Sequence, residues 1–569
     1  MSAGALRLYG TEEPVEPAQR LHAGPLTLEL QRGQLRRIRC GALEVWHGLA
    51  FVLRDADWGT PQPELHVVDV QGDGHAFELR IEGRFAAGLD YRLHAVGRAD
   101  GSVHVDVEAV PRTDLHVNRV GLCLMHPLTA CGACVEVRHV DGRRSASTFP
   151  TLIPPWPPFM LVRALRHEWA PGRWAEAELL GDLFETEDQR NNGDASFKTY
   201  SRSNMAPRPC TLHAGVMLRQ SAVLRVDAGP PVGADRPPLA VTVAVGASAG
   251  ALPPIGIEIE AADAAVPALR EVLAELRPAH LHLAWRPGLA VDWHGVAAML
   301  AAAGARLRLD ATPVHRAALL ALKRGLDEAG LVPESLAVFP SEPSTIATAH
   351  ELFRGSAIGG GTPHFFVQLS RLDALGDVDF ASFTTSALVH GAADDDVMLG
   401  LASLSVMVET WRARHPEIPL RVGPNGIAAR ASPLGAQPAS DGTRRIALAA
   451  IDPRSRAQFG AAWALGHAAA FAGAGVDAIT LGALAGPRGV VAVEGGRIVY
   501  HPAFAVLQEL GRPAQRLACT VSHPDRIAAL ALRRGASNRL LLANLSAEPQ
   551  TVQLDTAILL QPFAVSTHG

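Results

Sequence analysis

Apolar strands and amphipathic helices alternate along residues 255–510, and this alternation constrains the fold more than any other feature of the chain. Short apolar stretches such as 255–260, 280–285 and 305–311 are each followed by a segment with the apolar period of a helix, about 3.6 residues. About eight such units in about 250 residues match a closed barrel of parallel strands with helices outside. The sequence therefore predicts a (β/α)8 barrel over residues 251–511, with an open, doubly wound parallel sheet as the alternative.

The residues on either side of this region follow the two-residue period of strands. Stretches 26–30, 76–81 and 103–107 alternate apolar and polar side chains, and turn-forming Gly and Asp separate them. Many short strands of this kind predict a large antiparallel β-sandwich over residues 1–250, with a proline-rich linker at 229–238 near its end. Short strands return later and predict a small C-terminal β-sandwich over residues 512–569.

Charge and hydropathy exclude several classes of protein. The chain has 52 Lys and Arg residues against 57 Asp and Glu, for a formal net charge of −5, and no long basic block. Binding to nucleic acid or to a membrane surface is therefore not expected. No run of about 18 apolar residues is present, and the first residues lack a basic stretch followed by an apolar one. We expect a cytoplasmic protein whose partner is a small molecule.

Two cysteines have a spacing that metal or redox sites use. Cys131 and Cys134 form a Cys-x-x-Cys pair, but the other four cysteines are scattered singly, so no second pair completes a zinc site. His126 and His139 lie near this pair in the sequence. Buried free thiols are the favoured interpretation, and no cofactor is predicted.

Segment 185–200 holds the most varied group of polar side chains. Between Phe184 and Phe197 and just beyond, it contains carboxylates, amides, a guanidinium, an ammonium group and a phenol: Glu185, Glu187, Asp188, Gln189, Arg190, Asn191, Asp194, Lys198 and Tyr200. Such a mixture supplies the acceptors, donors and planar fork that a polyhydroxylated ligand needs. A solvated polar loop is the alternative, and composition alone slightly favours it.

The predicted barrel strands offer a second group of candidates, because reacting groups in such barrels lie at the carboxyl ends of strands. These ends carry Glu258, Glu260, His282, Trp285, Asp310, His364, Thr384, Thr385, Ser386, His390, Asp394, Asn425 and Thr480. Each is also a plausible capping or turn residue, and Asp394 stands where a helix begins. No Asn-Glu pair ends the fourth strand, where Glu342 is the nearest substitute, so a retaining glycosidase pair is not indicated.

Several segments resemble the D-apionate lactonases, which hydrolyse sugar-acid lactones in apiose breakdown. They are Trp58-Gly-Thr60 after Val52-Leu-Arg-Asp-Ala-Asp57, Asn118-Arg-Val-Gly-Leu-Cys123, Ala164-Leu-Arg-His-Glu168, the run 185–200, Phe383-Thr-Thr-Ser386 with Val389-His390 and Asp394, Arg421-Val-Gly-Pro-Asn425, Asp452-Pro-Arg454 and Ile479-Thr-Leu-Gly482. They cover most of the chain. Two positions depart from the family pattern: Asn192 replaces a Trp, and Gln368 replaces a Glu. If that Glu is catalytic in the family, Gln368 cannot act as its base.

The resemblance implies hydrolysis of a five-membered, D-apionolactone-like lactone to the open-chain acid. The candidate water-activating bases are Glu187, Asp188 and His390, the last oriented by Asp394. Arg190 or Lys198 would stabilise the oxyanion and hold the product carboxylate. The remaining predicted substrate-binding residues are Glu185, Asn191, Asp194, Tyr200 and Asn425. No metal is required, although a divalent ion on Glu187 and Asp188 is an open alternative.

Two other functions stay open at this point. One is a glycoside hydrolase with the same barrel-plus-sandwich build, using Glu187 or Glu342 with another carboxylate. The other is a non-catalytic carbohydrate-binding homologue, which the Gln368 departure makes conceivable. The lactonase hypothesis makes one demand on the fold, because the run 185–200 lies in the N-terminal half and must reach the mouth of the barrel.

Overall fold

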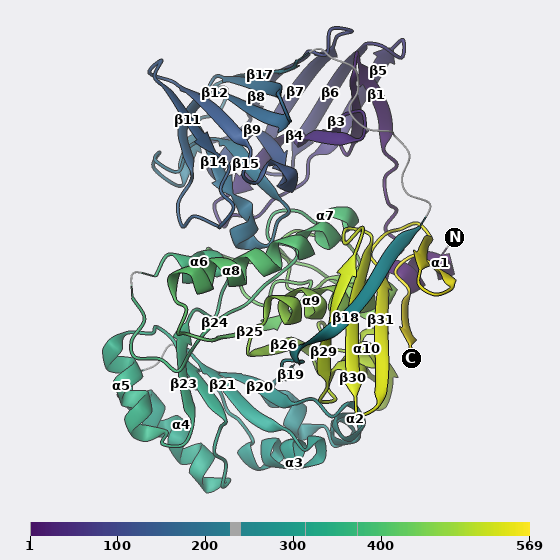
Figure 1. The fold of residues 1–569 in the computed structure, drawn as a ribbon. Coiled ribbons are helices and arrows are strands. Elements are labelled where there is room, and N and C mark those ends of the chain that lie inside the picture. Colours follow the sequence, from purple (N-terminus) through teal and green to yellow (C-terminus); the bar gives the residue numbers. More distant parts are fainter. Residues whose placement is uncertain (1, 228–239, 313–314, 373) are drawn as a thin grey trace.

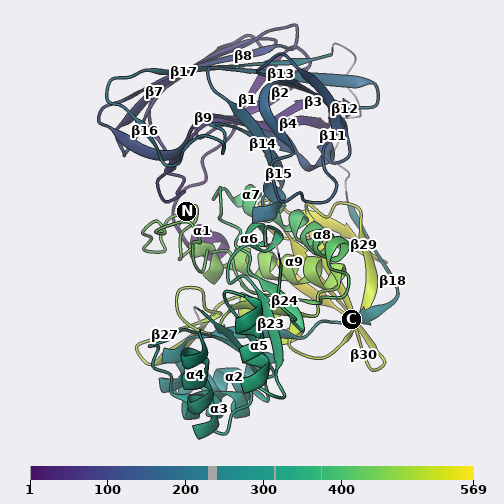
Figure 2. The ribbon, with the colours of Figure 1, turned by 90° about the vertical axis from the view of Figure 1, so that its left-hand side faces the viewer.

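A computed structural model describes residues 2–227, 240–312, 315–372 and 374–569, so the predicted linker at 229–238 lies outside the described residues. An N-terminal β domain lies over one side of a central barrel, and a C-terminal sheet packs beside that barrel (Figures 1 and 2). Within the described ranges, no helix has the length and apolar character needed to cross a lipid bilayer.

The N-terminal domain is an antiparallel β structure, as predicted. Its strands are β1 (Gln19–Ala23), β2 (Leu26–Gln31), β3 (Gln34–Cys40), β4 (Leu43–Asp55), β5 (Glu64–Gly72), β6 (Phe77–Phe85), β7 (Leu89–Gly97), β8 (Val103–Pro111), β9 (Leu115–Pro127), β10 (Cys134–His139), β11 (Arg144–Thr148), β12 (Phe159–Ala170), β13 (Arg173–Leu180), β14 (Phe184–Asp188), β15 (Ser196–Ser201), β16 (Cys210–Leu212) and β17 (Leu218–Val226). The predicted alternation is visible in β6–β8, where every second residue is buried. The long strand β9 pairs with both β4 and β15 and so forms the centre of the domain.

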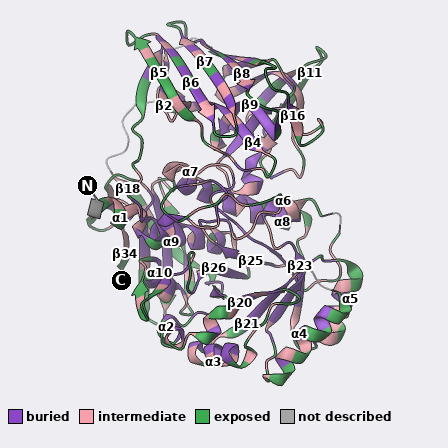
Figure 3. Cartoon of the chain, turned by 180° about the vertical axis from the view of Figure 1, so that it is seen from behind, coloured by how far each residue is buried: buried purple, intermediate pink, exposed green. Residues whose placement is uncertain are grey.

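The central region closes into a parallel barrel, which confirms the (β/α)8 prediction and excludes the open sheet. The strands are β19 (Ile255–Ile259), β20 (His280–Trp285), β21 (Arg306–Ala311), β22 (Ser335–Val338), β23 (Ala357–Gly361), β24 (Phe380–Phe383), β25 (Leu420–Asn425) and β26 (Ala478–Ala483), and β26 pairs back onto β19. Figure 3 shows these strands buried, with exposed outer faces on the surrounding helices. Burial on both faces explains why the strands are almost continuously apolar.

The helices around the barrel follow the strands in sequence. They are α2 (Ala268–Leu276), α3 (Trp293–Ala303), α4 (Arg316–Glu328), α5 (Pro343–Leu352), α6 (Phe366–Ser370), α7 (Asp394–Leu399), α8 (Leu404–Arg414), α9 (Gln458–Ala474) and α10 (Ala503–Leu510), with a hairpin of β27 (Val491–Glu494) and β28 (Arg497–Tyr500) after β26. The N-terminal domain lies over α6, α7 and α8 (Figure 1).

The C-terminal sheet contains one strand from an unexpected part of the chain. Its order is β33 (Ala557–Leu560), β32 (Gln550–Gln553), β18 (Val241–Ala251), β29 (Gln515–Val521), β30 (Ile527–Arg534), β31 (Ser537–Asn544) and β34 (Val565–His568). The boundary at residue 250 assigned β18 to the N-terminal domain, but β18 pairs with β29 and β32 instead. The N-terminal helix α1 (Ser2–Tyr9) also leaves its predicted domain, because Tyr9 packs against Phe459 and Phe563.

The run 185–200 contacts the barrel domain through the helices that follow β23 and β24. The short helix η2 (Gln189–Asn192) packs against α6, α8 and η4 (Gly400–Ser403). The fit is close, because a Cβ atom on Gly400 would lie 2.5 Å from the carbonyl oxygen of Gly193. Ion pairs from Arg36 to Asp395 and Asp396 join the same two domains nearby.

Candidate functional site

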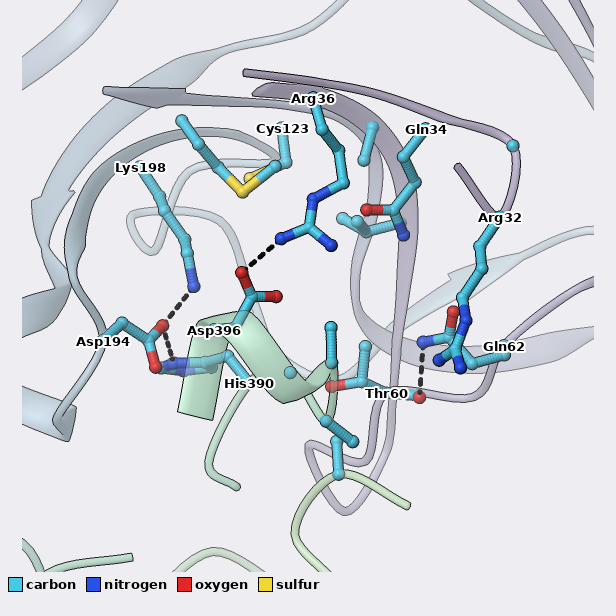
Figure 4. A pocket seen from close by; sticks show the side chains of 18 of the residues that line it. Arg32, Gln34, Arg36, Thr60, Gln62, Cys123, Asp194, Lys198, His390 and Asp396 are labelled. Carbon is cyan, nitrogen blue, oxygen red and sulfur yellow. Dashed lines mark hydrogen bonds and ion pairs between the residues drawn. The ribbon is translucent and has the colours of Figure 1, made fainter. Parts of the chain in front are cut away.

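A cavity of about 310 Å³ lies where the N-terminal domain meets the barrel (Figure 4). Strands β3, β4, β9 and β15 line it from one side, and the loop after β24 with the start of α7 lines it from the other. Its polar lining includes Arg36, Arg54, Asp194, Lys198 and His390. The cavity is of the size that binds a small molecule.

The two-residue period of the strands aims polar side chains into this cavity. Lys198 and Tyr200 of β15 lie opposite Met125 and Cys123 of β9, and all four line the cavity. The intervening Phe197 points to the other face of the sheet, where its ring lies 4.9 Å from that of Phe149. The pattern in the run 185–200 is therefore that of a strand with one functional face and one core face.

His390 and Asp194 form a hydrogen-bonded pair across the domain interface. His390 Nδ1 lies 2.8 Å from Asp194 Oδ2, and the Lys198 ammonium binds the same carboxylate oxygen (Figure 4). The side chains of Asp194 and His390 are 17% and 14% exposed, so they are shielded from bulk water yet open to the cavity. No protein atom within the described ranges hydrogen-bonds His390 Nε2.

The environment of the pair sets its protonation. Burial lowers the pKa of His390 to about 4, with Lys198 acting in the same direction and Asp194 opposing. Burial alone would raise the pKa of Asp194, but the Lys198 ammonium holds that pKa well below its ordinary value. Asp194 is thus an acceptor, His390 donates Nδ1–H to it, and the lone pair of the neutral ring is on Nε2. This is the arrangement of a general base.

The predicted pairing of His390 with Asp394 is wrong. Asp394 accepts from Arg445 Nε at 2.9 Å and from Arg454 Nη1 at 2.8 Å, and Arg454 in turn pairs with buried Asp452. Arg454 lies in η5 (Pro453–Arg456) and Arg445 in the loop before it, so the two arginines hold the start of α7 against this segment. Asp394 therefore stabilises the loop that carries His390, and Asp194 takes the orienting position.

Asp188 and Arg190 pair with each other rather than with the cavity. Arg190 Nη2 lies 2.6 Å from Asp188 Oδ2, and the guanidinium also donates to the carbonyl oxygens of Pro150 and Thr151. Both side chains are nearly fully buried, and neither lines the cavity. The predicted roles of Asp188 as a base and of Arg190 at the oxyanion do not match these positions, because the two side chains bind each other and Arg190 also binds the backbone at Pro150 and Thr151.

Glu185 and Glu187 lie next to the cavity, behind Tyr200. Both carboxylates bind Arg119, whose guanidinium lies 4.6 Å above the Tyr200 ring. Glu187 also accepts from Asn204 and from Gln189 Nε2, the latter at 2.7 Å. Burial opposes ionisation of Glu187, but Arg119 lowers its pKa overall. A carboxylate that is held ionised by several donors is a poor general base.

The other predicted binding residues are dispersed. Asn191 is buried and accepts from Asn192 at 2.8 Å. Asn425 accepts from the Thr385 backbone N–H at 2.8 Å and lines a separate cavity of about 50 Å³ in the barrel. Gln368 lies on α6 and is not part of the lining of the cavity at His390.

Two metal sites were considered from the sequence, one at Cys131 and Cys134 and one at Glu187 and Asp188. Across the described part of the chain, no three His, Cys, Asp or Glu side chains are grouped to hold a metal ion. The Cys-x-x-Cys residues are free thiols, and Cys131 Sγ accepts from Arg190 Nη1 at 3.2 Å.

Sequence reasoning missed the cations that β3 and β4 bring to the cavity. Arg36 and Arg54 line it and are buried. A signal for Arg54 was present, since it stands in the segment Val52-Leu-Arg-Asp-Ala-Asp57 that precedes Trp58-Gly-Thr60 and shares its family resemblance. Without that resemblance, an arginine at a polar position of an alternating strand is expected to face solvent.

Comparison with known proteins supports a single family along the whole chain. The models for the N-terminal domain, the TIM barrel domain and the C-terminal immunoglobulin-like domain of D-apionate lactonase match residues 6–229, 255–515 and 524–567. A D-apionate lactonase of Brucella anthropi is 33% identical over 98% of each chain.

Solved structures are more distant. An endo-β1,6-glucanase is 11% identical with a TM-score of 0.39, over 60% of this chain and 95% of its own. An α-L-arabinofuranosidase from Thermotoga maritima is 10% identical with a TM-score of 0.37, over 58% of this chain and 97% of its own. Likeness at this level carries no functional argument.

Proposed function

Because the chain belongs to the D-apionate lactonase family, we propose that it hydrolyses D-apionolactone, or a closely related five-membered sugar-acid lactone, to the open-chain acid. The observation that carries the proposal is the Asp194–His390 pair, in which His390 lines a cavity of about 310 Å³ and no described protein atom hydrogen-bonds its Nε2. A neutral imidazole oriented by a carboxylate is suited to activate water.

The proposed reaction begins with His390. Nε2 takes a proton from a water molecule as the water oxygen attacks the lactone carbonyl carbon, and the carbonyl π electrons move onto the carbonyl oxygen. Asp194 stabilises the imidazolium that forms, because its carboxylate already accepts the Nδ1 hydrogen. The Lys198 ammonium binds the same oxygen of Asp194 and helps to hold the carboxylate in place.

The second step opens the ring. The tetrahedral intermediate collapses, the bond from the acyl carbon to the ring oxygen breaks, and the imidazolium returns its proton to the leaving alkoxide. The product carboxylic acid then ionises and releases one proton to solvent at neutral pH. The net change is one lactone and one water to one hydroxy-carboxylate and one proton.

A glycosidase mechanism fits the cavity less well. Such enzymes need two carboxyl groups facing the substrate, and the acid among them needs a raised pKa. Of the described residues, the carboxylates that line this cavity are Asp194 and Asp396. Burial raises the pKa of each carboxyl group. Lys198 outweighs this effect at Asp194 and Arg36 outweighs it at Asp396, so both pKa values are lowered. Neither residue is poised to donate a proton.

The proposed base predicts an unusual pH profile. Protonation of His390 removes the attacking lone pair, and its pKa is lowered to about 4 from an ordinary value of 6.5. We therefore expect kcat/KM to stay level between neutral pH and about pH 5, and to fall tenfold per pH unit below about pH 4. An inflection near pH 6.5 would show that His390 is not held in the neutral form.

This profile needs a folding control. The unfolded chain takes up the His390 proton at about pH 6.5 and the folded chain only at about pH 4, so this group reduces stability as pH falls through that interval. Circular dichroism at each pH separates loss of fold from loss of the base. A reaction without enzyme corrects for spontaneous lactone opening.

The proposed activity is tested by proton release from purified protein with a panel of aldonolactones that includes D-apionolactone, with and without chelator. Fast, chelator-insensitive release from D-apionolactone is the expected result, because His390 supplies the base. Release from an aryl glycoside but from no lactone would support the glycosidase alternative. Tight binding of sugar acids without turnover of any substrate would support a non-catalytic homologue.

A further inference from the structure

Arg54 is a buried cation on the wall of the cavity. Arg54 lies near the end of β4, is only 4% exposed to solvent, and lines the same cavity as His390. The guanidinium donates to neutral groups: Thr60 Oγ1, Tyr200 Oη at 3.4 Å from Nη2, and the His390 carbonyl oxygen at 3.5 Å from Nη1.

Arg54 differs from the other buried cations of this cavity, because none of the described Asp or Glu residues forms an ion pair with it. Arg36 pairs with Asp395 and Asp396, Arg445 pairs with Glu13 and Asp394, and Lys198 pairs with Asp194. Within the described ranges, no Asp or Glu forms an ion pair with Arg54. An uncompensated buried charge is costly, so its retention beside a cavity indicates an anionic ligand.

The position of Arg54 relative to His390 identifies the part of the ligand it would meet. The guanidinium contacts the backbone of His390 itself and the phenol of Tyr200, which lies on the same face of the sheet as Lys198. A substrate whose carbonyl carbon is within reach of a water on Nε2 must direct its carbonyl oxygen toward a donor. The other buried cations on that side, Arg36 and Lys198, are already paired with carboxylates, and Arg32, which also lines the cavity, is only half-buried.

We propose that Arg54 is the anion-binding residue of this cavity: it receives the lactone carbonyl oxygen as negative charge develops there, and then binds the carboxylate of the sugar-acid product. This inference rests on the proposed function and deepens it, because it transfers to Arg54 the role that the sequence assigned to Arg190 or Lys198. No oxidation is involved; one C–O bond forms to the water oxygen, one acyl C–O bond breaks, and the two product oxygens share the charge that the guanidinium fork faces.

The main test is equilibrium binding of the open-chain acid, D-apionate, measured by calorimetry. The acid cannot be turned over by hydrolysis, so binding is measured independently of catalysis. We expect Arg54→Gln to raise the Kd for the acid roughly 100-fold, because a buried charge pair is lost. Arg54→Lys should raise Kd roughly 10-fold, since it keeps the charge and loses the planar fork. Arg92→Gln is the matched control, because Arg92 is 73% exposed and pairs with Glu82.

Turnover gives the second readout. We expect kcat for the lactone to fall roughly 100- to 1,000-fold in Arg54→Gln, as for the loss of an oxyanion donor. An unchanged Kd for the acid in Arg54→Gln, or no saturable binding of the acid by the wild-type protein, would overturn the inference. If Arg54→Gln does not fold, an unchanged Kd and kcat in Arg54→Lys would count against it equally.

These results separate the two proposals. A wild-type protein that hydrolyses no lactone, yet binds the acid through Arg54, would refute the proposed function and leave the anion site in place. Equal rates of lactone hydrolysis by the wild-type protein and by Arg54→Gln would refute the anion site alone.

Discussion

Replacing His390 with asparagine is expected to lower kcat for lactone hydrolysis by roughly 100- to 10,000-fold, the range that a general base contributes. The asparagine amide can still donate to Asp194, but nothing takes the place of Nε2. Steady-state proton release from D-apionolactone measures the change. The folded structure should persist, since the side chain faces the cavity and no protein hydrogen bond within the described ranges depends on Nε2.

Two comparisons make this result specific to the base. Added imidazole should restore part of the lost rate to His390→Gly, because removing the side chain leaves room for a free imidazole beside Asp194. Glu187→Gln is the competing variant, since Glu187 was also a candidate base. A larger loss of kcat in Glu187→Gln than in His390→Asn, with both proteins folded, would move the base to Glu187 and refute the present assignment.

Asp194→Asn is expected to lower kcat by roughly 1,000- to 10,000-fold, because the amide can hold the imidazole in the wrong tautomer and cannot stabilise the imidazolium. The variant should also be less stable by about 3–5 kcal/mol, since it leaves the buried Lys198 ammonium without its carboxylate. Both quantities can be measured on one preparation, by proton release and by denaturant unfolding.

The two effects of this substitution can be separated. In the double variant Asp194→Asn with Lys198→Met, the unpaired cation is removed, so stability should recover while kcat stays low. Recovery of kcat along with stability would mean that Asp194 acts only through the fold. The design works because Lys198 and His390 bind the same carboxylate oxygen for different reasons.

The barrel and the N-terminal sandwich could be predicted from the sequence, because their signals are local. A strand that is buried on one face alternates its side chains, and a βα unit switches between two periods within one short segment. The pairing of β18 could not be predicted in this way. Its residues read as a strand, but its partners β29 and β32 are separated from it by the whole barrel. No local pattern specifies which sheet such a strand joins.

The site shows the same division between local and tertiary information. The run 185–200 and His390 were identified by composition and by the family resemblance. The sequence predicts Asp394 as the partner of His390, whereas the structure supplies Asp194, which lies 196 positions earlier in the chain. Asp188 and Arg190 had suitable chemistry, but they are used in a buried pair of their own. Side-chain type is visible in a sequence, and the partner that a side chain finds is not.

The pair at the centre of the proposed reaction is divided between two domains with separate hydrophobic cores. Asp194 lies just before β15 in the N-terminal domain, and His390 lies on a loop of the barrel domain. Neither domain alone contains a complete reaction centre, and Arg54, the proposed anion-binding residue, belongs to the N-terminal domain although it contacts the backbone of His390. Exchanging the N-terminal domain between two relatives would therefore replace the orienting acid, the lysine and the arginine in one event while the base stayed behind. Residues on the two sides of the cavity are expected to covary across the family, so substrate preference should be inherited as a matched pair of surfaces.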